Sequence, residues 1–129
     1  MTATKRAGKS VPGFQIKRVY ETAARNDGLR VLVDRLWPRG LTKEKARIDL
    51  WLKDIAPSDA LRRLVHGDPA KWSEFVRSYG RELAAEPAKT AVADLRKQAR
   101  SKPVTLLYAA RDEVHNNAVA LKDFLERAK

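Results

Sequence analysis

The sequence predicts a small single-domain α/β fold, a layered structure with a mostly parallel sheet of three to four strands flanked by helices. The chain has 129 residues, which is an ordinary size for one domain. Two apolar runs, at 29–34 and 104–110, are typical of strands that are buried on both faces. Segments with helical spacing lie between these runs, and this order favours parallel pairing with helices on the faces of the sheet.

Four segments are expected to form strands. They span residues 14–20, 29–34, 48–55 and 104–110. The first carries apolar side chains at Phe14 and Ile16, and the third alternates Ile48, Leu50 and Leu52. The connection between the first two strands is too long for a tight hairpin, so these strands could pair in either direction.

Helices are expected in the remaining segments. Their predicted starts are Ser58, Asp68-Pro69, residue 88 and Asn116 or Asn117. Ser58 is a favoured N-cap, and a proline directly after Asp68 suits the first turn of a helix. Trp72, Phe75 and Tyr79 share one helical face, which indicates a core position. Within the expected loop at 35–47, Thr42 can cap a short helical turn.

Composition excludes several classes of protein. The chain has no cysteine, which excludes disulfides, thiolate zinc sites and a cysteine nucleophile. It has no apolar run long enough to cross a membrane, and its basic N-terminus lacks the apolar core of a secretory signal. We therefore expect a cytoplasmic protein without a membrane partner, in which residues 1–13 form a basic, disordered arm and residues 14–129 form the domain.

Two of the expected strands end next to the same residue types, one aspartate and one arginine. Asp34 and Arg35 come where one apolar run stops, and Arg111 and Asp112 come directly after the other. If these strands are parallel neighbours, the four side chains meet at the carboxyl edge of the sheet, where open α/β sheets bind ligands. We expect Asp34, Arg35, Arg39, Arg111 and Asn116 to contact that ligand.

These residue types suit a small anionic ligand, either phosphorylated or nucleotide-like. Arginine binds phosphate and carboxylate groups with two hydrogen bonds, and a nearby aspartate can orient it. Whether the protein is an enzyme stays open. If it is, His115 or Asp112 would be the catalytic acid–base group of a hydrolase or transferase. Two structural interpretations compete: the Asp–Arg pairs hold loops in place, and His115 and Asn116 cap the last helix.

The positive charge supports a second hypothesis. The formal net charge is +11, and such a field attracts nucleic acid as well as small anions. The loop at 35–47 has five basic residues and one acidic residue, and the arm adds Lys5, Arg6 and Lys9. A nucleic-acid-binding protein is therefore the first alternative, and a structural or interaction module without a ligand is the second. The sequence has no metal-binding motif and no cofactor-binding motif, so we expect neither a metal ion nor a cofactor.

Three blocks of the sequence carry a family resemblance. They are DRLWPRGLTKEKARIDLWLKDIAPS, HGDPAKWSEFVRSYGREL and VTLLYAARDEVHNNA. In order and spacing they resemble the YeaO-like bacterial proteins of the domain-of-unknown-function family 488, over about Ile16 to Leu125. The resemblance implies that Asp34–Gly40 and Arg111–Asn117 are hallmarks of the family, but it implies no activity. More distant members have a cysteine-histidine-arginine run near His115 to Asn117, whereas this chain lacks the thiol.

Overall fold

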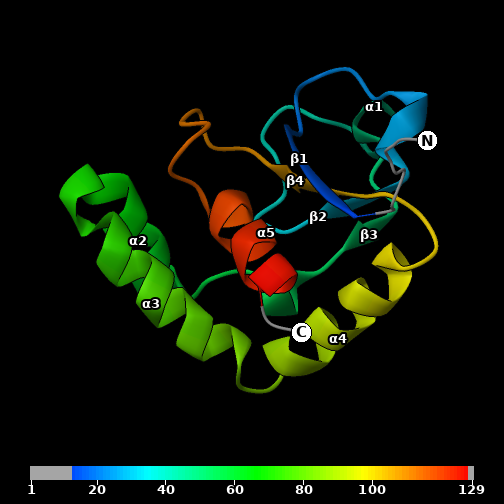
Figure 1. The fold of residues 1–129 in the computed structure, drawn as a ribbon. Helices are drawn as coiled ribbons and strands as arrows, with labels where there is room; N and C mark the ends of the chain where they lie inside the picture. Colours follow the sequence, from blue (N-terminus) through cyan, green and yellow to red (C-terminus); the bar gives the residue numbers. More distant parts are fainter. Residues whose placement is uncertain (1–12, 128–129) are drawn as a thin grey trace, which may run out of the picture.

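A computed structural model describes residues 13–127 of the protein, apart from four side chains at 65–67 and 69. It is a small α/β domain built on one four-stranded, fully parallel sheet with the order β1-β4-β2-β3 (Figure 1). The strands are β1 (Phe14–Arg18), β2 (Leu29–Leu32), β3 (Leu50–Trp51) and β4 (Val104–Tyr108). The predicted fold class is confirmed. Of the expected arm, residues 1–12 lie outside the described part of the chain.

The described part contains five α-helices and three short 3-10 turns. The helices are α1 (Lys43–Ala46), α2 (Asp59–Gly67), α3 (Trp72–Leu83), α4 (Ala88–Ala99) and α5 (Asn117–Arg127), and the turns are η1 (Arg25–Asp27), η2 (Lys53–Ile55) and η3 (Pro69–Lys71). The predicted caps form: Ser58 Oγ accepts the Leu61 N–H, and Thr42 Oγ1 accepts the Lys45 N–H. None of these helices is both long and apolar enough to span a membrane.

The strand β4 lies between β1 and β2, which therefore do not pair with each other. Val31 of β2 is level with Leu106 of β4, and Ile16 of β1 is level with the same residue on the other side. All five residues of β4 are buried, as its continuous apolar pattern predicts. The parallel register brings the carboxyl ends of β2 and β4 to the same edge of the sheet.

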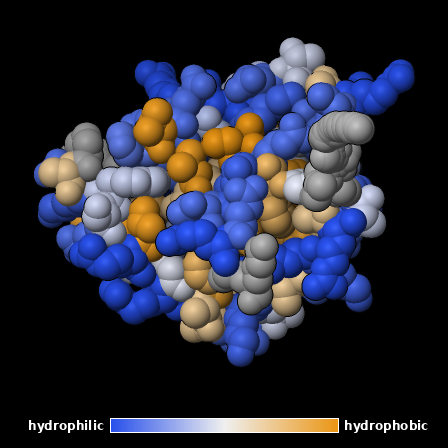
Figure 2. All heavy atoms as spheres, viewed as in Figure 1, coloured by the Kyte–Doolittle hydropathy of each residue, from blue (hydrophilic) through white to orange (hydrophobic). Residues whose placement is uncertain are grey.

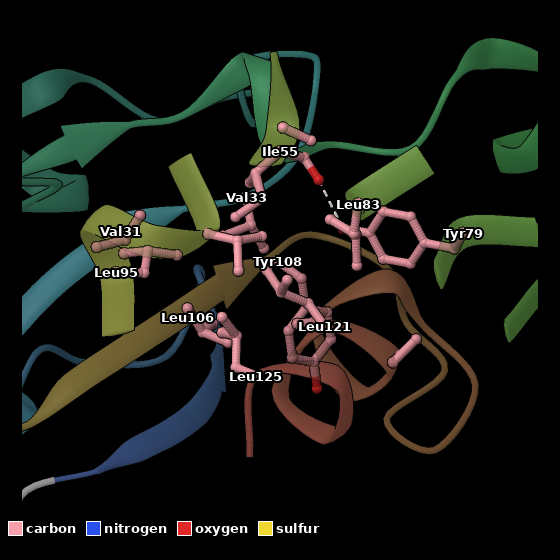
Figure 3. Close-up of a cluster of buried hydrophobic side chains, with 14 of the residues drawn as sticks. Val31, Val33, Ile55, Tyr79, Leu83, Leu95, Leu106, Tyr108, Leu121 and Leu125 are labelled. Carbon is pink, nitrogen blue, oxygen red and sulfur yellow. Dashed lines mark hydrogen bonds between the residues drawn. The ribbon is translucent and has the colours of Figure 1, made fainter. Parts of the chain in front are cut away.

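One face of the sheet carries the main core. Side chains from β2 and β4 pack there against α3, α4 and α5, which Figures 1 and 3 show on one side of the strands. Phe75 and Tyr79 of α3 are fully buried, as predicted. The hydroxyl of Tyr79 donates to the carbonyl of Ile55 at 2.6 Å, and burial raises the pKa of this phenol well above its ordinary value.

The third strand is shorter than predicted. The expected strand at 48–55 forms only β3, and the chain then turns through η2. The N–H of Leu52 still bonds the Leu32 carbonyl at 3.0 Å, and the N–H of Ile55 closes the turn onto the Leu52 carbonyl at 3.2 Å. The turn buries Ile55 completely. The alternating apolar residues of this segment therefore form a short edge strand and then bury Ile55 in the core.

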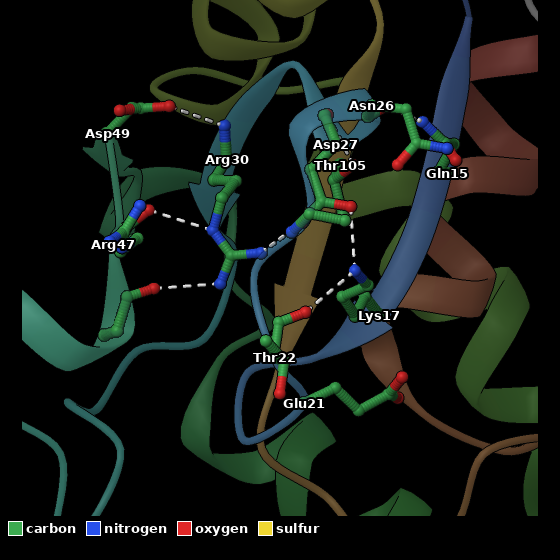
Figure 4. A network of polar contacts seen from close by, with 12 residues as sticks. Gln15, Lys17, Glu21, Thr22, Asn26, Asp27, Arg30, Arg47, Asp49 and Thr105 are labelled. Atoms are coloured by element: carbon green, nitrogen blue, oxygen red, sulfur yellow. Dashed lines mark hydrogen bonds and ion pairs between the residues drawn. The ribbon is translucent and has the colours of Figure 1, made fainter.

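The other face of the sheet holds a buried polar network (Figure 4). Asp27 pairs with Lys17 at 2.8 Å and with Arg30. The Arg30 guanidinium also donates to the carbonyls of Arg47 and Ala46, at 2.9 and 2.8 Å. Arg30 thus fixes the end of α1 against the sheet, and with it one end of the long loop that follows β2.

Candidate functional site

A cavity of about 330 Å³ opens at the carboxyl ends of β2 and β4. Its walls come from the end of β1, the loop after β2, the start of α2 and the start of α5. The polar and aromatic residues that line it are Tyr20, Asp34, Arg35, Trp37, Arg39, Arg62, Asn116 and Asn117. Four of the residues predicted from the sequence are among them: Asp34, Arg35, Arg39 and Asn116.

Asp34 ties together the three elements that meet at the cavity. Its Oδ2 accepts the backbone N–H of Ala109 at 2.9 Å, directly after β4. Its Oδ1 accepts the side-chain amide of Asn117 at 3.0 Å, at the start of α5. The same amide donates to the Val33 carbonyl at 3.0 Å. Asp34 and Asn117 therefore hold the segments that line the cavity together, and this carboxylate already has hydrogen-bond partners within the protein.

Three arginines give the cavity its positive charge. Arg35 makes only long hydrogen bonds, at 3.4 Å, to the carbonyls of Ala56 and Pro57. The guanidinium of Arg39 is exposed and makes no hydrogen bond to the described residues. Arg62 has a buried Nε without a partner in the described chain, and its Nη2 lies 3.4 Å from Asp59. These arginines therefore retain N–H groups that could donate hydrogen bonds to an anion.

Aromatic side chains complete the rim. Trp37 packs over the second face of the sheet, where its ring meets Trp51 edge-on at 5.4 Å and its Nε1 donates to the Leu41 carbonyl at 2.7 Å. Trp37 therefore folds back over the core on this face of the sheet. Tyr20 also lines the cavity and is 42% exposed.

Three residues that the sequence predicted for the site lie in the loop after β4 and do not line the cavity. Arg111, Asp112 and His115 are not among the residues that line it. The Asp112 carboxylate accepts the N–H groups of Val114 and His115, both at 2.9 Å, and so forms a turn at the surface. These two hydrogen bonds hold the pKa of Asp112 below its ordinary value, and the bond from the His115 N–H has the larger effect.

His115 and Asn116 have visible structural roles. The His115 ring lies 3.3 Å from the Asp112 carboxylate and meets the Trp72 ring edge-on at 5.1 Å. Asn116 is buried, and its Oδ1 accepts the Val119 N–H at 2.9 Å in the first turn of α5. Asn116 therefore caps this helix while it lines the cavity.

The ligand contacts predicted from the sequence left out four polar or aromatic lining residues: Tyr20, Trp37, Arg62 and Asn117. Asn117 has a sequence signal, because it adjoins Asn116 at the start of the last helix. Tyr20 and Arg62 have none, since they reach the cavity through the packing of β1 and α2. Among the described residues, no group of three or more histidine, aspartate or glutamate side chains could hold a metal ion.

Comparisons with known proteins identify a family but no activity. The protein is 44% identical over 113 residues to the uncharacterised protein YeaO of Escherichia coli, covering 87% of this chain and 96% of that one. It is 40% identical over 111 residues to the uncharacterised protein Rv3073c of Mycobacterium tuberculosis, covering 86% of this chain and 92% of that one. No solved structure matches. Residues 13–129 match the family model described as the inactive DUF488-N3 subclade. The chain therefore belongs to the YeaO-like proteins of family DUF488, within this subclade.

Proposed function

We propose that the protein binds a small anionic ligand, phosphorylated or nucleotide-like, in the cavity at the carboxyl edge of the sheet. The observation that carries this proposal is the lining of the cavity, which has three arginines and one carboxylate. The oxygens of that carboxylate, Asp34, already accept hydrogen bonds from Ala109 and Asn117. An anion entering the cavity would therefore meet a net positive charge and unused guanidinium donors.

Two observations favour binding without turnover. The matched subclade is described as inactive. In addition, Asp112 and His115, the two groups best suited to acid–base chemistry in the sequence, do not line the cavity. Hydrolase or transferase activity therefore has less support than binding.

A calorimetric titration with pyrophosphate and ribose 5-phosphate tests the proposal. Arg39→Ala removes an exposed cation of the cavity, and Arg100→Ala removes an exposed cation beyond the end of α4. Both variants lose the same charge. We expect Arg39→Ala to weaken binding about tenfold or more, since charge-assisted hydrogen bonds are involved. Arg100→Ala should change it by less than about twofold, because salt screens distant exposed charges.

Two results would overturn this proposal. If neither anion binds in about 50 mM salt, the cavity is not an anion site. If both variants weaken binding equally, the anions respond only to the net charge of the protein. A signal seen only with DNA or RNA would instead support the nucleic-acid alternative.

A further inference from the structure

We infer that the anionic ligand is a nucleotide, whose base stacks on Tyr20 while its phosphate contacts the arginines of the cavity. This inference rests on the proposed function and adds the chemical class of the ligand. It starts from an aromatic ring that is firmly held and yet exposed. Tyr20 comes directly after Val19, which is 2% exposed, whereas Tyr20 itself is 42% exposed and lines the cavity.

The surroundings of Tyr20 fix its position. Its hydroxyl donates to the Arg39 carbonyl at 2.9 Å. The Arg18 guanidinium lies 5.0 Å from the ring centroid. Arg18 is itself held, because its Nε and Nη2 donate to the carbonyls of Ala110 and Ala109, both at 2.9 Å. The ring is therefore presented to solvent in one orientation, so a ligand that stacks on it need not order it first.

The cavity lining also has exposed apolar surface, which a base could cover. Leu36 lines the cavity and is 61% exposed, so two large side chains with apolar surface, Tyr20 and Leu36, remain uncovered there. Inorganic phosphate or a sugar phosphate would leave these surfaces in water. A planar base would cover them, because each base has a face that stacks on aromatic side chains.

The cationic and aromatic parts of the site are adjacent. Arg39 supplies the carbonyl that accepts the hydrogen bond of the Tyr20 hydroxyl, and Arg39 lines the same cavity. A ligand that joins a phosphate to a flat ring within one small molecule matches this arrangement. The cavity volume of about 330 Å³ is at the small end of the range for ligand sites, which favours a mononucleotide over a dinucleotide.

Titration of AMP and UMP against ribose 5-phosphate tests this inference, because the nucleotides carry a base at C1 where ribose 5-phosphate carries a hydroxyl group. We expect the wild-type protein to bind AMP about tenfold or more tightly than ribose 5-phosphate, as base–aromatic stacking predicts. Tyr20→Leu should abolish this difference. Because it also removes the hydroxyl that bonds the Arg39 carbonyl, its affinity for ribose 5-phosphate is compared with that of Tyr20→Phe, which loses the same bond. Tyr20→Phe keeps the ring and should retain the preference for AMP. In NMR spectra of the wild-type complex, the base protons should shift upfield through the ring current of Tyr20.

The outcomes separate the two proposals. If ribose 5-phosphate and AMP bind equally well and the base protons do not shift, the anion site stands and the nucleotide inference is overturned. If none of the probes binds, the proposed function itself fails. The spectra of the wild-type complex decide the matter even if Tyr20→Leu does not fold.

Discussion

The carboxylate of Asp27 lies between two cations, Lys17 and Arg30, and Arg30 in turn bonds the end of α1. The Asp27 side chain is 5% exposed. Burial alone raises the pKa of this carboxyl group, but hydrogen bonds from Lys17, the Ala24 N–H and Arg30 lower it by more. The backbone carbonyl of Asp27 also accepts the Thr105 hydroxyl, at 2.6 Å. Asp27 thus joins β1, β2 and β4 on this face of the sheet.

We predict that Asp27→Asn lowers the free energy of unfolding by about 3 kcal/mol, because it leaves buried cations without their anion. Asp123→Asn is the control: it breaks an exposed pair with Arg127 and should cost less than about 1 kcal/mol. Urea denaturation of both variants at neutral pH measures the difference. Equal losses in the two variants would contradict a structural role for the buried pair.

The lowered pKa of Asp27 also fixes the direction of a pH effect. The stabilisation is complete above the pKa of an unfolded aspartate, about 3.9, and it is lost as the pH falls through the lower pKa of folded Asp27. In acid titrations of stability, the wild-type protein should therefore lose more free energy than Asp27→Asn. A parallel fall in both proteins would mean that Asp27 is not responsible.

Among the elements, the buried strands were the easiest to predict. β2 and β4 are mainly apolar, with one polar residue each, Arg30 and Thr105, because these strands lie inside the sheet and are covered on both faces. Asp34 could be predicted as a lining residue for the same reason, since it is the first polar residue after such a run. The short length of β3 could not be predicted, because apolar alternation does not show where an edge strand turns.

The loop after β4 shows why the rest of the site was harder to predict. Ala109 and Ala110 stay beside the cavity, but Arg111 and Asp112 do not line it. The direction of the chain there depends on the turn that the Asp112 carboxylate forms with Val114 and His115. Such a turn is a local hydrogen-bond choice that the apolar pattern does not encode. The participation of Tyr20 and Arg62 is a result of tertiary packing.

The start of β2 provides a test at this scale. Gly28 has a φ of +66°, and a Cβ at this position would overlap the Pro103 carbonyl. That carbonyl accepts the Leu29 N–H at 2.9 Å, the contact that begins the pairing of β2 with β4. Gly40 also has a positive φ, +82°, but a Cβ there would meet open space.

We predict that Gly28→Ala lowers stability by about 3 kcal/mol or more, since it combines backbone strain with a clash. Gly40→Ala should cost only about 1 kcal/mol, because it carries the backbone strain alone. Thermal and urea unfolding of the two variants give both values. If the two alanines cost the same, close packing against Pro103 is not what requires glycine at position 28.

The whole molecule carries its positive charge on several sides. Exposed arginines occur on the connections and on most of the helices: Arg25, Arg39, Arg63, Arg77, Arg100 and Arg127. Figure 2 shows hydrophilic residues over most of the face in view, with smaller hydrophobic areas between them. A dispersed field of this kind attracts polyanions without a defined interface. It differs from the cavity, where three arginines line one space.

This difference predicts how nucleic acid would bind. With a short single-stranded DNA, we expect the logarithm of the association constant to fall linearly with the logarithm of salt concentration, by about 0.7 for each phosphate neutralised. Arg25→Ala, Arg39→Ala and Arg100→Ala should weaken this binding to a similar, small extent, because the three cations lie on different elements. Fluorescence anisotropy at about 50 and 200 mM salt measures both effects. If Arg39→Ala alone abolished DNA binding at both salt concentrations, the loop after β2 would be a nucleic-acid interface, and the net charge would then serve to steer the strand toward it.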